Sequence, residues 1–178
     1  PPPSSVPTDT LQSGLQMVSF PYDFSALDQS LVLSPVTPMA AWDPATGQYS
    51  LPPDFPADSY RAGHGYWVRV PAQGASITAP TGVAPGPSTT VSLLTGWNMI
   101  GDPYNETVPV SKMQITVSPA AGISLAQAAA SNIIGPNLFS FNAGSFGYSA
   151  ISTTTGSIEP YSGYWIYASE PCTITINQ

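Results

Sequence analysis

The stretch that decides the fold is Gly96-Trp97-Asn98-Met99-Ile100-Gly101-Asp102-Pro103-Tyr104-Asn105, because an earlier stretch repeats it. The earlier stretch is Gly14-Leu15-Gln16-Met17-Val18-Ser19-Phe20-Pro21-Tyr22-Asp23, with its glycine, methionine and Pro-Tyr at equivalent positions. Further matching blocks follow in the same order: Leu31–Pro35 with Ile115–Pro119, Trp42-Asp43 with Phe141-Asn142, Tyr49-Ser50 with Tyr148-Ser149, Gly65–Val68 with Gly163–Ile166, and Ser76–Thr78 with Thr173–Thr175. Ordered blocks of this kind indicate an internal duplication.

The fold class that this duplication predicts is all-β, mainly an antiparallel sandwich or barrel, built from two pseudo-symmetric repeats. Period-two alternation supports strands: Tyr66, Val68 and Val70 alternate with Trp67 and Arg69, and Tyr164, Ile166 and Ala168 alternate with Trp165 and Tyr167. We predict one compact domain with these boundaries: a Pro/Ser-rich linker at 1–7, the first repeat at 8–83, a connector at 84–88 and the second repeat at 89–178.

The growing offset between the matching blocks locates an insertion in the second repeat, between Pro119 and Phe141. The insertion is rich in alanine, a strong helix former, and begins with Ser124, a good N-cap. Gly135-Pro136 is a stop signal, so we predict one short helix at about 124–134. A weaker helical turn is predicted at 25–31, and hairpin loops are predicted at 43–47 and 142–145.

Each repeat offers four or five short strands, too few for a comfortable closed sheet. We therefore expect the two repeats to pack about a pseudo-twofold axis, with an apolar interface and one shared core. Trp42, Trp97 and Tyr66 fall in the repeated blocks, and we expect them in this interior.

The composition of the 178 residues excludes several classes of partner. Three basic and ten acidic residues give a net charge of −7, so no basic face for nucleic acid can be assembled. No apolar run approaches the roughly 20 residues that span a bilayer, so membrane insertion is not expected.

The single Cys172 excludes an intrachain disulfide, and we interpret it as a small hydrophobe in a strand. Few charged residues and a Pro/Ser/Thr-rich start indicate an extracellular or cell-surface module joined to neighbouring domains of a larger chain.

Catalytic and metal-binding residues are not indicated. His64 is the single histidine and has no accompanying catalytic motif, so we interpret it as an exposed turn residue. Asp54 and Asp58 could hold calcium in a proline-rich loop, but the oxygen spacing of an EF-hand is missing. We favour solvated loop acids there, and we expect no cofactor and no enzymatic activity.

The repeated stretches resemble segments of repeat modules in large secreted bacterial proteins. Gly96–Tyr104 is similar to their "GWNLIGNPY" segment, Glu159–Ile166 to their "PGxGYWV" segment, and Trp42–Tyr49 to the hairpin between the two. The first repeat departs from this pattern at Leu15-Gln16 and at Ala62–Gly65. The resemblance implies secretion and modularity, and it implies no particular chemistry.

The candidate ligand-binding residues are aromatic side chains on the predicted outer faces of two strands. If Tyr164 and Ile166 face inward, Trp165 and Tyr167 point outward about 7 Å apart, a spacing that suits stacking on sugar rings. In the other interpretation, the helix or the first repeat covers Trp165. Trp67 and Arg69 are their counterparts in the first repeat, and Tyr161 completes the set.

The functional expectation is a non-catalytic module that binds carbohydrate or another extracellular ligand. The alternative is a structural or adhesion spacer without a small ligand, and a hydrolase is the third possibility. Exposed aromatic rings would favour glycan binding, whereas a surface with every tryptophan buried would favour the spacer.

Overall fold

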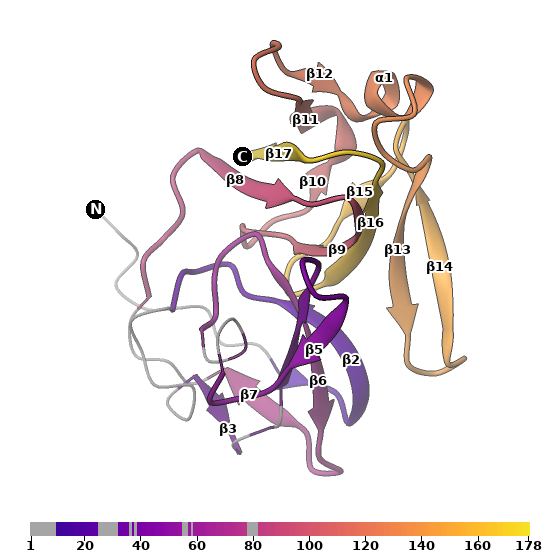
Figure 1. Ribbon diagram of the computed structural model, residues 1–178. Coiled ribbons are helices and arrows are strands. Elements are labelled where there is room, and N and C mark those ends of the chain that lie inside the picture. The colour runs from indigo at the N-terminus through magenta and orange to yellow at the C-terminus, as the bar shows by residue number, and fades with distance from the viewer. Residues whose placement is uncertain are drawn as a thin grey trace.

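The computed structural model describes residues 10–24, 32–35, 37, 39–54, 57, 59–77 and 82–178 (Figure 1). In these residues the fold is all-β, with antiparallel sheets, one short α-helix and one 3-10 turn, which confirms the predicted fold class. The predicted linker at 1–7 and the predicted helical turn at 25–31 lie outside the described residues.

Two antiparallel sheets form the described part of the first repeat, drawn from indigo to magenta in Figure 1. The larger sheet has the order β2-β6-β4-β5, and the smaller has the order β1-β7-β3. The strand bounds are Thr10–Leu11 (β1), Gly14–Ser19 (β2), Leu33–Ser34 (β3), Met39–Asp43 (β4), Gln48–Ser50 (β5), Gly65–Val70 (β6) and Ala75–Ile77 (β7).

The second repeat holds two four-stranded sheets, β14-β13-β16-β9 and β12-β11-β17-β8, and a small pair, β10-β15. The strand bounds are Ser88–Leu93 (β8), Gly96–Gly101 (β9), Val108–Pro109 (β10), Met113–Thr116 (β11), Ile123–Ser124 (β12), Asn137–Asn142 (β13), Gly147–Ser152 (β14), Ser157–Ile158 (β15), Gly163–Ala168 (β16) and Cys172–Asn177 (β17). A 3-10 turn at Val110–Lys112 precedes β11.

The strands of the two repeats pair in the same way. β2 pairs with β6 as β9 pairs with β16, and β4 forms a hairpin with β5 as β13 does with β14. We call β2-β6-β4-β5 and β14-β13-β16-β9 the inner sheets, and β1-β7-β3 and β12-β11-β17-β8 the outer sheets. In the outer sheets, β7 lies between β1 and β3 as β17 lies between β8 and β11. A duplication requires this correspondence of strand pairs. Superposition of the two repeats stays a prediction.

The predicted helix is α1, Leu125–Ala130, which is shorter than the predicted 124–134. Ser124 is its N-cap, and Ser124 and Gln127 form a reciprocal capping box. The helix stops at Ser131 because the chain then returns to the sheet, where Ile134 forms a bridge with Ala168. Leu125 and Ala128 bury the inner face of α1 in the core of the second repeat.

The buried residues form three clusters, so the single shared core that we expected is wrong. Each repeat has its own core between its inner and outer sheets, as Tyr66 and Val68 show in the first repeat and Tyr164 and Ile166 in the second. Strand alternation explains this, because each inner sheet turns one face to its own core and the other face to the partner repeat. A third cluster between the repeats contains Met17, Trp67, Met99 and Trp165.

The backbones of the two repeats touch at two matching places. Val18 forms an antiparallel bridge with Ser162, and Ile100 forms one with His64. The Ser19 N–H donates to the Tyr161 carbonyl over 3.1 Å, and the Gly101 N–H donates to the Gly63 carbonyl over 2.9 Å. These contacts join equivalent positions of the aligned repeats in opposite directions, as a twofold arrangement requires.

Glycine is needed where the two backbones come this close. A Cβ at Gly65 would lie 2.6 Å from the Ile100 carbonyl oxygen, and one at Gly163 would lie 2.9 Å from the Val18 carbonyl oxygen. Both obstacles are backbone atoms, so no side chain can rotate away to make room. The two glycines therefore set how closely the repeats can pack.

We predict that Gly65→Ala destabilises the protein by about 1–3 kcal/mol, because the new methyl group forces the repeats apart. Urea denaturation measures the loss. Gly86→Ala is the matched control, since a Cβ at Gly86 would have no heavy atom closer than 4.0 Å. Equal stability of the two variants would contradict the close approach.

Candidate functional site

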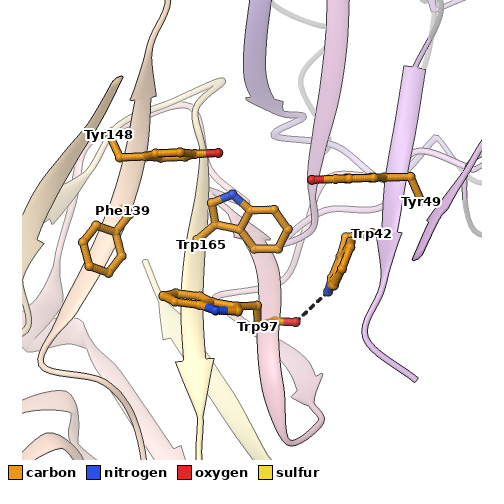
Figure 2. A pocket seen from close by; sticks show the side chains of 6 residues that line it. All are labelled: Trp42, Tyr49, Trp97, Phe139, Tyr148 and Trp165. Atoms are coloured by element: carbon orange, nitrogen blue, oxygen red, sulfur yellow. Dashed lines mark hydrogen bonds between the residues drawn. The ribbon is translucent and has the colours of Figure 1, made fainter. Parts of the chain in front are cut away.

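Six aromatic side chains line a cavity of about 440 Å³ where the two repeats meet (Figure 2). We call it the aromatic pocket, and its lining consists of Trp42, Tyr49, Trp97, Phe139, Tyr148 and Trp165. The first repeat supplies two of these residues and the second supplies four. The pocket therefore exists only when the repeats are packed together.

Two β-hairpins supply the side walls of the pocket. Trp42 and Tyr49 face each other in the register of β4 and β5, with ring centroids 5.0 Å apart. In the equivalent hairpin of β13 and β14, Tyr148 lies opposite Phe141, and Phe139 lies two residues from Phe141 on the same face. Cross-strand pairing thus places aromatic rings beside one another from residues on either side of each turn.

Trp42 ties the two repeats together at the pocket. Its indole N–H donates to the Trp97 carbonyl over 2.7 Å, the dashed line in Figure 2. Its ring meets that of Trp165 edge to face, with centroids 5.4 Å apart and an interplanar angle of 83°. Trp97 is likewise edge to face with Trp165, so the rings enclose the hollow from different directions.

The pocket is apolar apart from a few groups at its rim. Figure 2 shows Tyr49 and Tyr148 reaching toward each other from opposite sides with their hydroxyl groups leading. The Tyr49 hydroxyl accepts a hydrogen bond from the Trp67 indole N–H over 3.1 Å. Burial raises the pKa of Tyr49 above its ordinary value, so this phenol stays neutral at physiological pH. No charged residue belongs to the lining.

The structure separates the predicted residues of the second repeat. Trp165 and Tyr167 lie on one face of β16, as alternation predicts, and Trp165 forms part of the pocket lining. Trp165 is only 9% exposed, however, because the first repeat covers it, as our other interpretation had it. Tyr167 is 39% exposed and lies outside the lining, with its ring 5.4 Å from that of Trp97.

The other predicted residues do not belong to the pocket lining, although Trp67 adjoins it through its hydrogen bond to Tyr49. Trp67 is buried between the repeats, with its ring 4.9 Å from that of Phe141. Arg69 is exposed near the end of β6, opposite Leu15. Tyr161 borders a separate, polar hollow.

Five pocket residues were absent from the predicted site: Trp42, Tyr49, Trp97, Phe139 and Tyr148. The expectation that Trp97 is interior is wrong, since 44% of it is exposed, and Trp42 is partly exposed as well. Tyr66 is buried, as predicted. The hairpin motif could have predicted these pocket residues, because aromatic residues that flank a tight turn come to lie opposite each other.

The remaining reactive groups form no recognisable catalytic arrangement among the described residues. His64 is partly buried rather than exposed, and burial lowers the pKa of its imidazole. Cys172 is buried at the start of β17, as predicted, and burial raises the pKa of its thiol. Asp54 is exposed and Asp58 lies outside the described residues. In the part of the chain that the structure describes, no three His, Cys, Asp or Glu residues cluster as metal ligands.

Asp102 is the most perturbed carboxyl group. It is fully buried, its Oδ1 accepts from the Tyr104 N–H over 2.8 Å, and its Oδ2 has no hydrogen-bond partner. Burial raises its pKa to about 7, against the opposing effect of the Tyr104 hydrogen bond, and Glu159 and Glu106 raise it further. The group lies outside the pocket lining, so we assign it to stability rather than to ligand binding.

No family model, curated protein or solved structure matches this chain. The resemblance to secreted repeat modules therefore stays an expectation. Among the described residues, no helix has the length and apolar character needed to cross a membrane.

We predict that the protein loses stability as the pH rises from about 4 to 7. Asp102 keeps its proton in the folded state over a range in which the unfolded chain has lost it, so deprotonation favours unfolding. Asp102→Asn should therefore raise the melting temperature at pH 8 relative to wild type, and much less at pH 4. The gain at pH 8 is about 4 kcal/mol at most.

Calorimetry at both pH values measures this difference. Asp54→Asn is the matched control, because it makes the same change at an exposed carboxylate. If the advantage of Asp102→Asn is the same at pH 4 and pH 8, Asp102 is not the titrating group.

Proposed function

We propose that this chain is a non-catalytic, secreted or cell-surface β-module that binds carbohydrate in the aromatic pocket as an accessory part of a larger protein. The observation that carries the proposal is the exposure of aromatic rings around one hollow. Trp97 is 44% exposed, Tyr49 48% and Tyr148 56%. A purely structural spacer would have no need to keep these rings in contact with water.

The physical basis is stacking between aromatic rings and the apolar C–H faces of sugars. The pocket has about 440 Å³ of space, within the roughly 300–1,000 Å³ of small-molecule sites. Its exposed rim rings allow a sugar to stack while its hydroxyl groups remain hydrated. Because the sugar hydroxyl groups keep their water, the lack of polar partners in the pocket lining costs little desolvation free energy.

The lining of the pocket supports binding over catalysis. Hydrolysis of a glycosidic bond needs two carboxyl groups that flank it, and no Asp or Glu lines the pocket. No histidine or thiol lines it either, so the Tyr49 and Tyr148 hydroxyls have no general base among the lining residues.

The charge and composition of the chain support its proposed surroundings. A net charge of −7 disfavours nucleic acid as a partner. The low charged fraction of 7% suits an extracellular surface better than a cytoplasmic one. Its partners would be a glycan or other cell-surface ligand and the neighbouring domains.

We predict that Trp97→Ala and Tyr148→Ala each weaken saccharide binding by about 5- to 150-fold, because each removes one stacking ring worth about 1–3 kcal/mol. Pull-down on insoluble cellulose, xylan, mannan and chitin identifies the ligand, and calorimetry with the matching oligosaccharide measures affinity. Binding should change little with salt, since no charged side chain lines the pocket.

Phe146→Ala is the matched control. Phe146 is a 76% exposed aromatic residue at the turn between β13 and β14, outside the pocket lining, so its loss should leave affinity unchanged. Tetramethylammonium is a second probe, because aromatic rings also bind organic cations. Binding of that cation without any saccharide would overturn the glycan proposal, and binding of neither would favour the spacer.

A further inference from the structure

A second hollow at the junction of the repeats has the opposite chemistry to the aromatic pocket. It measures about 450 Å³, and we call it the polar groove. Its lining residues include Gln12, Gln16, Ser140, Asn142, Ser149 and Tyr161. In total, three carboxamides and four serine hydroxyls border it, and no charged residue does. Such a surface suits a neutral ligand that is rich in hydrogen-bonding groups.

One hairpin separates the chemistries of the two hollows. Along β13 and β14, Phe139 and Tyr148 belong to the aromatic pocket, whereas Ser140 and Ser149 belong to the polar groove. Ser140 and Ser149 lie directly opposite each other in the strand register. Because side chains alternate between the faces of a strand, Ser140 and Ser149 lie on the opposite face of the hairpin from Phe139 and Tyr148. Phe141, on the aromatic face, also borders the polar groove.

Several polar groups of the groove remain available for a ligand. Among the described residues, the side chains of Gln12, Ser13, Ser140 and Ser149 make no hydrogen bond with one another or with any other residue. By contrast, the Asn142 Oδ1 accepts from the N–H groups of Gly144 and Ser145 and holds the turn in place. The groove therefore combines a fixed wall with unengaged donors and acceptors.

Tyr161 adds an aromatic ring at a position where glycine would suit the backbone better. Its φ is 59°, in the left-handed region, and the aligned residue of the first repeat is Gly63, with φ 82°. A bulky side chain is disfavoured in this conformation, whereas glycine is not. The ring of Tyr161 is half-buried against the core of the first repeat and also borders the groove, as Phe141 does.

We propose that the polar groove is a second binding site, which takes a neutral sugar unit. The carboxamides and serine hydroxyls of the groove would form hydrogen bonds to the sugar, and the rings of Tyr161 and Phe141 would flank it. Vicinal sugar hydroxyls donate and accept at once, which matches carboxamides and serines. The lack of lysine and arginine in the lining disfavours uronic acids and phosphates. This site does not depend on ligand binding in the aromatic pocket.

The test is NMR titration of the full ¹⁵N-labelled chain with cellohexaose, xylohexaose, mannohexaose and maltohexaose, and with hexagalacturonate as the acidic probe. We expect at least one neutral probe to shift the amide signals of residues 12–16, 140–144 and 149. Ser140→Val/Ser149→Val should weaken that binding about tenfold, as the loss of two hydrogen bonds implies. Valine suits a strand, so the fold should persist.

Ser88→Val/Ser92→Val is the matched control, since it makes the same change at exposed positions of β8 and should leave binding unchanged. Gln12→Ala gives a second variant if the double variant does not fold. Tyr148→Ala should weaken the binding that shifts signals at the aromatic pocket and leave the shifts of the groove, so that the two sites fail separately. The proposal would be overturned if the groove signals shifted only with hexagalacturonate, or if none of the probes shifted them. It would also be overturned if both groove variants bound the neutral probe as tightly as wild type.

Discussion

The close approach of two backbones at Gly65 and Gly163 is the constraint on which the rest of the structure depends. These glycines allow the Val18–Ser162 and Ile100–His64 bridges to form between the repeats. Each bridge anchors a strand of an inner sheet, so the inner sheets are held face to face at a fixed distance. That distance leaves room for large aromatic side chains and determines which of them remain partly open to water.

The aromatic residues between the repeats serve packing and, in our proposal, recognition. Trp67 and Trp165 occupy equivalent strand positions and are both 9% exposed, but only Trp165 borders the aromatic pocket. The difference comes from the neighbours: position 97 carries tryptophan in the second repeat, where the first repeat has Leu15. The two repeats thus share a framework but differ in surface, because substitutions at exposed positions leave the packing of the core unaltered.

The two hollows at the repeat junction divide the chemistry that carbohydrate recognition uses. The aromatic pocket offers ring faces with few polar partners, and the polar groove offers unengaged amides and hydroxyls with few rings. The hairpin of β13 and β14 contributes to both through opposite faces. Strand alternation supplies the hairpin's contribution to both hollows, and turn residues such as Gln12, Ser13 and Gly144 complete the polar groove.

The sequence by itself determined the all-β class, the two hairpins and the place and N-cap of the helix, because alternation, turn residues and capping act between near neighbours. The repeated blocks also predicted that Tyr66 lies inside, which the structure confirms. Only the tertiary structure decided that each repeat has its own core and that Trp97 is exposed and Trp165 covered. It also decided that Tyr161 borders the polar groove and not the aromatic pocket. These outcomes depend on which sheet faces meet, and residues distant in the chain, such as Trp42 and Trp165, decide that through packing.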